Sequence, residues 1–409
     1  MNKHSIILSH SGKQHSYYVA KALLDLGYLQ KFYTSSYISS KWLQGLINSL
    51  DLTFWSRRFE SGLGGQYVDS NWKYEIGELV ARKLNSNSKA VNELVYKRDV
   101  SFDRDISKRL LRKKYECFWG FQGSSLESIK IANQMNAHSI CEMTIAHLPY
   151  AQRVLNEEAK LHPEWEDSID FTSFPVHYEK RLIEEPYEAK SVIAISDFLK
   201  KTLVEGGIEP AKIKVIPLGF DISAIRYVPE TVSLKNRPLR LLYAGRITQR
   251  KGMKYLLEAI KSFSVRDVEL HIIGNIHGTG NAFNQYKEFY HFKPGVTQQV
   301  LFGMYSKYDA LVFPSVLEGF GLVTVEAMGA GLPVITTPNT NATELVVNGE
   351  NGFVIPIRDT EAIIHAIRTM RNLTDEKYIS MRACARATAL KYTWDVHRLK
   401  ISEMLTELN

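Results

Sequence analysis

The chain alternates short runs of hydrophobic residues with longer segments in which hydrophobic residues recur every three or four positions. The short runs predict buried strands and the longer segments predict amphipathic helices. Their alternation is typical of a parallel α/β sheet. In the first half, the expected strands are 4–10, 28–34, 115–121, 137–145 and 191–196. A second series contains the expected strands 239–245, 268–274, 310–315, 332–338 and 352–357.

A polar, proline-containing segment without periodicity separates the two series and predicts a linker near residues 221–238. We therefore expect a first Rossmann-like domain at 1–222, a second at 223–390 and a last helix at 391–409, capped by Thr393. Ligands of open parallel sheets bind at the carboxyl ends of the strands. The cleft between two such domains is consequently the expected site.

Residues 36–114 fit this alternation least well, and we interpret them as an insertion of mostly helical segments. The 409 residues are 44% hydrophobic and 23% charged, which is typical of soluble globular proteins. No apolar stretch is long enough for a membrane span. The three scattered cysteines, without a C-x-x-C pair, argue against a disulfide framework or zinc site and favour a cytoplasmic location.

The net charge of +7 is concentrated in residues 97–114, which hold eight cations and three anions. Such a segment would be attracted to an anionic membrane surface by roughly 1 kcal/mol for each nearby cation. A solvated helix face explains the same pattern equally well. Nucleic acid is disfavoured, because the segment lacks the interleaved aromatic residues that stack on bases.

The stretch VFPSVLEGFGLVTVEAMGAG, from residue 312, places two carboxylates where an expected strand passes into a helix. The backbone around Gly319, Phe320, Gly321 and Leu322 opens that helix, so its N–H groups predict an anion site. Glu318 precedes the helix, and Glu326 lies one and a half turns inside it. Carboxylates are how proteins hold ribose hydroxyls, and the set therefore predicts a sugar nucleotide.

Taken alone, this pair is better explained as two surface glutamates. A dinucleotide fingerprint is disfavoured, because its third glycine position is Thr324. The segment YAGRITQRKG, 243–252, changes the balance. Arg246 and Lys251 bracket the start of the next helix, and a planar guanidinium with a point-charge ammonium makes a diphosphate clamp.

In the first half, Gly12 follows the first strand and could present its N–H to a phosphate across the cleft. A Walker A loop is excluded by its spacing. Further along, the segment CEMTIAHLPY leaves His147 in the loop after a strand, where it could bind hydroxyl groups. A satisfied structural histidine is an equal alternative for His147. Glu142 is the nearest rival candidate for this role, but it lies inside the strand.

Together, GRITQRKG, FPSVLEGFGLVTVEAMGAGLPVI and NGENGFVI resemble the nucleotide-binding domain of family-4 retaining glycosyltransferases, which have the two-domain α/β GT-B fold. The resemblance is most specific over 240–360. It implies that the E-x7-E glutamates lie in the donor site, with Glu318 at the sugar hydroxyls and Glu326 at the ribose. It further implies that Arg246 and Lys251 bind the diphosphate. Backbone groups of Gly12 and 320–322 would assist, and His147 would be the first-domain histidine.

The resemblance implies transfer from a UDP- or GDP-sugar to a glycan or lipid-linked acceptor, with retention and with neither a metal nor another cofactor. Synthesis of cell-surface polysaccharide or lipopolysaccharide, in the cytoplasm or peripherally on the inner membrane face, follows as the expected role. A sugar-nucleotide epimerase is the main alternative, and a nicotinamide-dependent oxidoreductase and a non-catalytic nucleotide-binding protein are weaker ones. The base, the sugar and the linkage are not encoded in any motif.

Overall fold

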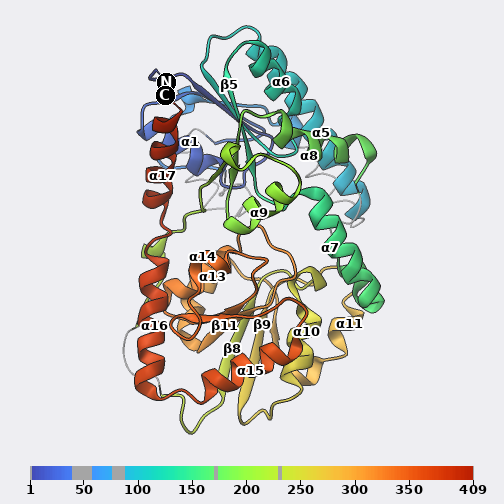
Figure 1. Ribbon diagram of the computed structural model, residues 1–409, viewed down its shortest axis with the longest axis vertical. Helices are drawn as coiled ribbons and strands as arrows, with labels where there is room; N and C mark the ends of the chain where they lie inside the picture. The colour runs from blue at the N-terminus through green and yellow to red at the C-terminus, as the bar shows by residue number, and fades with distance from the viewer. Residues whose placement is uncertain (1, 39–57, 76–87, 170–173, 229–232, 409) are drawn as a thin grey trace.

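The computed structural model describes residues 2–38, 58–75, 88–169, 174–228 and 233–408. Among these residues the chain forms two parallel sheets, one above the other in Figure 1. The first has the strand order β3-β2-β1-β4-β5-β6-β7. Its strands are β1 (Ile6–His10), β2 (Leu29–Thr34), β3 (Val68–Ser70), β4 (Cys117–Phe121), β5 (His138–Met143), β6 (Ser191–Ala194) and β7 (Ile213–Val215).

The second sheet has the strand order β10-β9-β8-β11-β12-β13. In both sheets the order reverses direction next to the first strand, which is the Rossmann-like arrangement that opens a crevice at the carboxyl edge. The strands of the second sheet are β8 (Leu239–Ala244), β9 (Val268–Ile273), β10 (His291–Lys293), β11 (Ala310–Phe313), β12 (Val334–Thr336) and β13 (Gly352–Val354).

Helices cover both sheets (Figure 1). Those of the first domain are α1 (Ser16–Asp25), α5 (Ser88–Leu110), α6 (Leu126–Gln134), α7 (Leu148–Leu161), α8 (Val176–Glu188) and α9 (Asp197–Glu205). Those after β8 are α10 (Met253–Ile260), α11 (Asn281–Asn284), α12 (Gln298–Met304), α13 (Leu322–Gly329), α14 (Ala342–Leu345), α15 (Thr360–Arg371), α16 (Asp375–Ala389) and α17 (Trp394–Glu407).

Every strand expected from a hydrophobic run is present, and the α/β class is confirmed. The pattern missed β3, β7 and β10, which have three residues each and are three of the four edge strands of the two sheets. Edge strands of this kind are only partly buried or exposed, so their sequences carry no continuous hydrophobic run. The expected insertion 36–114 contains β3 and the long helix α5, while 39–57 and 76–87 lie outside the described residues.

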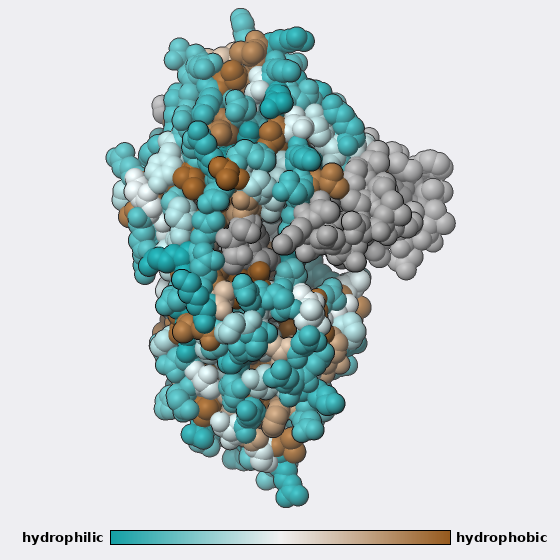
Figure 2. Space-filling view, turned by 90° about the vertical axis from the view of Figure 1, so that its right-hand side faces the viewer, coloured by the Kyte–Doolittle hydropathy of each residue, from teal (hydrophilic) through white to brown (hydrophobic). Residues whose placement is uncertain are grey.

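The core lies between the sheets and their helices. All residues of β1, β4 and β11 are buried, as expected for strands covered on both faces. Figure 2 shows a mostly hydrophilic face on which hydrophobic residues are scattered. Within the described part of the chain, no helix combines the length and the hydrophobicity needed to cross a membrane.

The last helix returns to the first domain, so that both chain ends lie at the same end of the molecule (Figure 1). Thr393 caps α17 by accepting a hydrogen bond from the Val396 N–H, as predicted. The rings of Trp394 and Tyr18 stack with centroids 3.8 Å apart, which joins α17 to α1. The chain therefore crosses between the domains a second time after the linker.

Candidate functional site

The loop after β8 carries the cationic residues of the second domain. Thr248 caps a short 3₁₀ turn, η5 (Gln249–Lys251), by accepting from the Arg250 N–H. Gly252 follows with φ +71°, and a Cβ there would overlap the carbonyl oxygen of Pro314. Only glycine fits this turn without strain, and the turn aims Lys251 at the next loop.

The side chain of Lys251, from the loop after β8, reaches the loop that connects β11 to α13. The Lys251 side chain is buried, with its ammonium 4.8 Å from the centre of the Phe313 ring. It forms an ion pair with the Glu318 carboxylate. The structure thus brings together two predicted site residues that lie in separate motifs of the sequence.

The N-terminus of α13 opens beside this pair. Its N-cap, Gly321, has φ +79°, and no side chain caps the helix there. The Phe320 side chain is buried, while Leu322 at the first helical position is half-buried. Uncapped N–H groups and the helix dipole favour an anion at this point.

Arg250 is a residue of this site that the sequence analysis missed. One of its guanidinium nitrogens donates to the carbonyl of Leu317 at 3.0 Å and lies 3.3 Å from the Glu318 carboxylate. Its own carbonyl oxygen accepts from the N–H groups of Val316 and Leu317 at 3.0 and 3.2 Å. Arg250 therefore ties the two loops together. The dipeptide Arg250-Lys251 is the sequence feature that could have indicated this residue, whereas the resemblance to the family indicated Arg246.

Arg246 has an exposed side chain at the end of β8, and its carbonyl oxygen accepts from the Tyr243 hydroxyl at 2.7 Å. No ion pair or hydrogen bond among those described here joins Arg246 to Lys251. Its role at a diphosphate stays a prediction.

Glu326 is buried within the second domain. Gln298 donates to one carboxylate oxygen at 2.6 Å, and the Tyr305 hydroxyl donates to the other at 3.1 Å. Burial raises the pKa of Glu326, against the effect of these two donors. The carboxylate is held from α12 and the turn after it, so a ribose would have to share or replace those partners. Its assignment to a ribose stays a prediction.

The loop before α13 also touches the first domain. A Cβ on Gly319 would overlap the Thr144 carbonyl oxygen, and the Gly319 carbonyl accepts from Ser196 Oγ at 2.7 Å. The N–H of Asp197 at the start of α9 donates to the Glu344 carboxylate. A small cavity at this junction is lined from both domains, by Ile145, Ala146, Leu148, Ala151, Arg250, Leu317, Glu318 and Gly319. The predicted donor loop and the first domain therefore face one another directly.

Gly12 is buried in the loop after β1, and its N–H donates to His10 Nδ1 at 2.6 Å. Burial lowers the pKa of His10 to about 4, so the ring is neutral and able to accept that bond. The N–H that was predicted to meet a phosphate is thus engaged by His10 in this structure. A phosphate at Gly12 would have to displace the His10 ring.

His147 begins α7, where its N–H donates to Thr202 Oγ1 at 3.0 Å. Its ring packs so closely on α9 that a Cβ at Gly206 would overlap it, and it meets the Tyr187 ring edge-on at 5.9 Å. Burial lowers the pKa of His147. These contacts lie inside the first domain, and the cavity is lined by the preceding Ile145 and Ala146 instead. Within the described residues its buried Nε2 has no hydrogen-bond partner, so the ring is not a fully satisfied structural histidine, and its role at hydroxyl groups stays a prediction.

Glu142 does lie inside β5, and it is bonded by His15 and by the Trp119 indole N–H. Interactions with His15 bring the pKa of Glu142 below its ordinary value although burial opposes this. His397 of α17 lies nearby, and its Nδ1–H donates to the Pro217 carbonyl, 2.7 Å away. The cluster thus joins strand β5, helix α1 and the returning helix α17.

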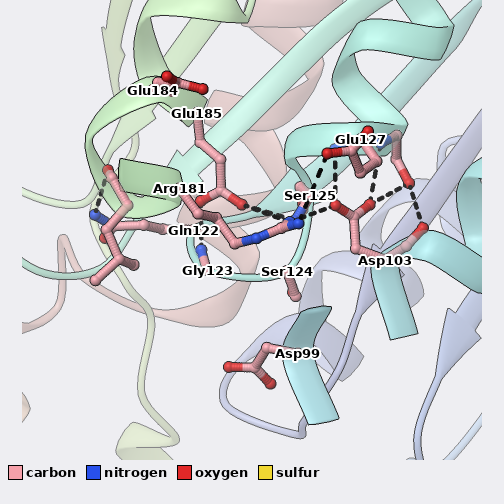
Figure 3. A network of polar contacts seen from close by, with 12 residues as sticks. Asp99, Asp103, Gln122, Gly123, Ser124, Ser125, Glu127, Arg181, Glu184 and Glu185 are labelled. Atoms are coloured by element: carbon pink, nitrogen blue, oxygen red, sulfur yellow. Dashed lines mark hydrogen bonds and ion pairs between the residues drawn. The ribbon is translucent and has the colours of Figure 1, made fainter. Parts of the chain in front are cut away.

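A second buried network supports the carboxyl edge of the first sheet (Figure 3). Arg181 of α8 binds Asp103 of α5 and lies 3.8 Å from Glu185. Asp103 accepts from the backbone and hydroxyl of Ser128, and Glu185 accepts from the N–H groups of Gly123 and Ser125. Burial raises the pKa of Glu185 to about 8. The loop after β4 and the start of α6 are therefore held by buried carboxyl groups that come from two helices.

Comparison with known proteins places the second domain in a family. Residues 238–372 match the family described as "Glycosyl transferases group 1". The capsular polysaccharide biosynthesis glycosyltransferase CapM of Staphylococcus aureus is 32% identical over 206 residues, which cover 45% of this chain and 53% of CapM. The lipopolysaccharide 1,2-N-acetylglucosaminetransferase of Salmonella typhimurium is 26% identical, covering 61% of this chain and 74% of that protein. The chain thus spans only about half the length of several relatives.

Solved structures extend the likeness to the whole chain. Sucrose-phosphate synthase from Thermosynechococcus elongatus superposes with a TM-score of 0.66 at 16% identity, with 98% of each chain covered. HepE from Anabaena, in complex with UDP, gives 0.63 at 17% identity, with 98% of this chain and 99% of that one covered. At these identities the likeness shows the fold alone, which is the two-domain GT-B fold. The chain therefore contains, at residues 238–372, a domain of the glycosyl transferases group 1 family.

Proposed function

We propose that the protein is a glycosyltransferase that moves a sugar from a nucleoside diphosphate sugar to a glycan or lipid-linked acceptor. The observation that supports this most directly is the Lys251–Glu318 pair beside the uncapped N-terminus of α13. A cation, a carboxylate and free helix N–H groups at one strand edge match the parts of a sugar nucleotide. The relatives named above, with roles in capsular polysaccharide and lipopolysaccharide synthesis, support the same reaction class.

In the proposed mechanism, Lys251 and Arg246 stabilise the charge that develops on the departing diphosphate, together with the N–H groups that open α13. Lys251 forms an ion pair with Glu318, so a bound diphosphate would compete with that carboxylate for the ammonium group. Glu318 is then free to orient the hydroxyl groups of the sugar. Because cationic side chains meet the leaving group, we propose that no metal is required.

Retention follows in this proposal from attack of the acceptor on the same face from which the diphosphate leaves. A phosphate oxygen of the leaving group accepts the proton of the attacking hydroxyl. We assign no step to His147, because its ring packs inside the first domain. Ile145 and Ala146, which line the cavity, are the residues of this loop that would meet the donor.

The proposal is tested by offering UDP-, GDP-, ADP- and dTDP-sugars to the purified protein. A donor at 100 times its dissociation constant should stabilise the fold by about 2.7 kcal/mol, which a thermal shift detects. Slow release of free sugar with unchanged anomeric configuration would support a retaining transferase. Release of an epimerised sugar without acceptor would support an epimerase instead, and binding without any turnover would leave a nucleotide-binding protein.

Glu326→Ala tests the ribose assignment. Loss of a hydrogen bond to a charged group should weaken nucleoside diphosphate binding by about 1.5–3 kcal/mol, or roughly 10- to 150-fold. Glu361→Ala is the matched control, because Glu361 is an exposed glutamate of the same domain, in the first turn of α15. Equal affinity of Glu326→Ala and Glu361→Ala for the diphosphate would remove Glu326 from the donor site.

We further propose a peripheral contact between residues 97–114 and the cytoplasmic face of an anionic membrane, where a lipid-linked acceptor would be found. Lys97, Arg104 and Lys108 are exposed along α5 at helical spacing, and Arg112, Lys113 and Lys114 are exposed directly after it. Leu111, with 57% of its surface accessible, lies between the two groups. An exposed hydrophobic residue within a cationic face is suited to the headgroup region.

Vesicle flotation tests this contact. Replacing Arg104, Lys108 and Arg112 by glutamate should abolish binding to vesicles that contain phosphatidylglycerol and leave turnover of a water-soluble acceptor intact. Unchanged vesicle binding by the triple variant would contradict the contact.

A further inference from the structure

A first-domain segment, residues 154–168, lies on the second domain, and we call it the strap. It comprises the last two turns of α7 and the following 3₁₀ helix η2 (Pro163–Ser168). In Figure 1, α7 leaves the upper domain and runs down to the level of α10 and α11. The strap begins seven residues after His147 and therefore connects the first-domain side of the cavity with the loops after β8 and β9 of the second domain.

Glu158 holds the strap in place. Its side chain is fully buried although it belongs to the first domain. Three groups of the second domain donate to its carboxylate: Gln249 Nε2 at 2.7 Å, the Tyr255 hydroxyl at 2.9 Å and Arg358 Nε at 2.7 Å. A buried carboxylate is stable only when its lone pairs are satisfied in this way. The two domains thus share one buried charge.

Contacts with the strap hold the backbone of Arg358 in an unfavourable conformation. Its φ of +63° lies in the left-handed region, which is unfavourable for a residue with a Cβ. Its guanidinium donates to Glu158, to Glu157 at 2.8 Å and to the carbonyl of Val154 at 2.9 Å. A strained backbone persists where the surrounding contacts hold it, and these contacts all come from the strap.

The strap also holds two loops at the carboxyl edge of the second sheet. On the loop after β8, Thr248 Oγ1 donates to the Ser168 carbonyl, and the Gln249 N–H donates to Ser168 Oγ at 3.0 Å. On the loop after β9, the Thr279 N–H donates to the Asp167 carboxylate at 2.7 Å. The first of these loops ends in Lys251, so the strap is attached two residues before a site residue.

Gln249 connects Glu158 of the strap to the first turn of α10. Its side chain donates to Glu158 and accepts from the N–H of Lys254, which opens α10. The turn η5, which carries Arg250 and Lys251, is thereby fixed between a first-domain carboxylate and the start of a second-domain helix. A side-chain placement set by several buried hydrogen bonds is what a preorganised cationic site requires.

We propose that the strap is a positioning element for the diphosphate-binding side of the cleft, and that Glu158 is the positioning residue on which it depends. In this proposal the first domain contributes to donor binding in two places. One part of it faces the donor across the cleft, and the strap fixes the loop that carries Arg250 and Lys251. This inference rests on the proposed function only in naming a nucleoside diphosphate as the ligand. That the strap immobilises 246–251 and 274–280 is independent of the ligand.

The test compares Glu158→Gln with Glu157→Gln in the full chain. The two glutamates are adjacent and share Arg358 as a partner, but Glu157 is exposed. In Glu158→Gln one carboxylate oxygen becomes an NH2 group, which faces either Arg358 or the Gln249 and Tyr255 donors, so part of the contact with the second domain is lost. We expect faster amide exchange in 246–251 and 274–280, no change in β1 and β4, and an affinity for UDP or GDP weakened on the order of tenfold, as for other misplaced binding groups. Saturating diphosphate should restore the exchange protection of 246–251.

Equal exchange rates in these loops for Glu158→Gln and Glu157→Gln would overturn the proposal. So would a uniform rise in exchange over both sheets, which would mark Glu158 as a residue of general stability alone. If the parent protein binds neither UDP nor GDP, the proposed function fails, but the exchange data still decide on the strap.

Ser168→Ala provides a milder variant in case Glu158→Gln does not fold. It removes the acceptor of the Gln249 N–H and keeps the buried carboxylate. Exchange at Gln249 and its neighbours should rise by a smaller factor than in Glu158→Gln. Unchanged exchange at Gln249 in Ser168→Ala would likewise contradict the proposal.

Discussion

The carboxyl edges of the two sheets are built in different ways. In the second domain, glycines and main-chain bonds shape the loops: Gly252 and Gly321 have left-handed φ values, and the carbonyl of Arg250 holds the loop after β11. In the first domain, buried charges from distant helices shape the loops. Arg181, with Asp103 and Glu185, supports the loop after β4 (Figure 3).

This difference decides how well the loops at each edge can be predicted from the sequence. Loops shaped by glycines and by nearby main-chain bonds carry their determinants within a few consecutive residues. Loops held by partners 60 to 80 positions away, as for Asp103 with Arg181, carry no local determinant. It also bears on the proposed function, in which Lys251 exchanges Glu318 for a ligand at the second edge, whereas we expect loss of a buried charge at the first edge to destabilise the fold.

The largest expected effect concerns the first edge. Arg181→Met leaves Asp103 and Glu185 buried with less compensation and should lower the free energy of unfolding by about 3–5 kcal/mol. Lys180→Met is the matched control: Lys180 is exposed and forms an i,i+4 ion pair with Glu184, so its loss should cost under about 0.5 kcal/mol. Urea unfolding measures both. Similar values for the two variants would refute the account of the first edge.

The next effect is a loss of stability in acid that arises in the first domain. Burial lowers the pKa of His397 to about 4, with Glu142 and His15 nearby, whereas an unfolded histidine titrates near 6.5. The folded state binds fewer protons, so this contribution is fully present above pH 6.5 and is lost as the pH falls through 4. Between pH 7 and 4.5 it should amount to about 2.5 kcal/mol.

Urea unfolding of the parent and of His397→Gln at both pH values checks this prediction. The variant should be less stable at pH 7, because the hydrogen bond to Pro217 is altered, but it should lose less stability on acidification. A parallel loss in both proteins would assign the acid sensitivity to other groups, with His10 as the first candidate.

Removing a cation from the carboxyl edge of the second sheet, as Arg181→Met does at the first, should weaken ligand binding more than it lowers the stability of the fold. Lys251→Met removes a buried cation, but Glu318 keeps the Arg250 guanidinium at 3.3 Å, so the loss of stability should be about 1 kcal/mol. Loss of a charged contact to the diphosphate should weaken its binding by about 1.5–3 kcal/mol. Calorimetric titration with the diphosphate and urea unfolding separate the two effects. If Lys251→Met lost as much stability as Arg181→Met, the proposed difference between the two edges would be contradicted.

The smallest expected effect tests the meaning of the second-domain glycines. Gly303 of α12 is exposed, with open space where a Cβ would lie, so Gly303→Ala should stabilise the protein by about 0.4–1 kcal/mol. Gly252→Ala should destabilise it, because φ is +71° and a Cβ would overlap Pro314. Thermal unfolding of both variants measures the contrast. The same sign of change at both positions would show that the second-domain glycines do not serve close approach.

Much of the second domain could be predicted from the sequence. Its strands other than β10, the helix at Leu322 and the glycine turns followed from hydrophobic runs and local motifs. The motifs also predicted that Lys251 and Glu318 face one crevice, and the structure brings the two side chains together. The first-domain site could not be predicted in the same way. Whether His147 faces the cavity or packs on Gly206 depends on helix α9, which begins fifty residues later.

The sequence by itself determined the two parallel sheets and the cationic and carboxylate groups at the second sheet's edge, because hydrophobic periodicity and turn chemistry act over a few residues. Only the tertiary structure decided that Gly12 bonds to His10, that Arg250 ties the loops of the site together, and that Glu158 crosses into the other domain. Those outcomes depend on which donors surround a buried acceptor, and the donors come from distant parts of the chain.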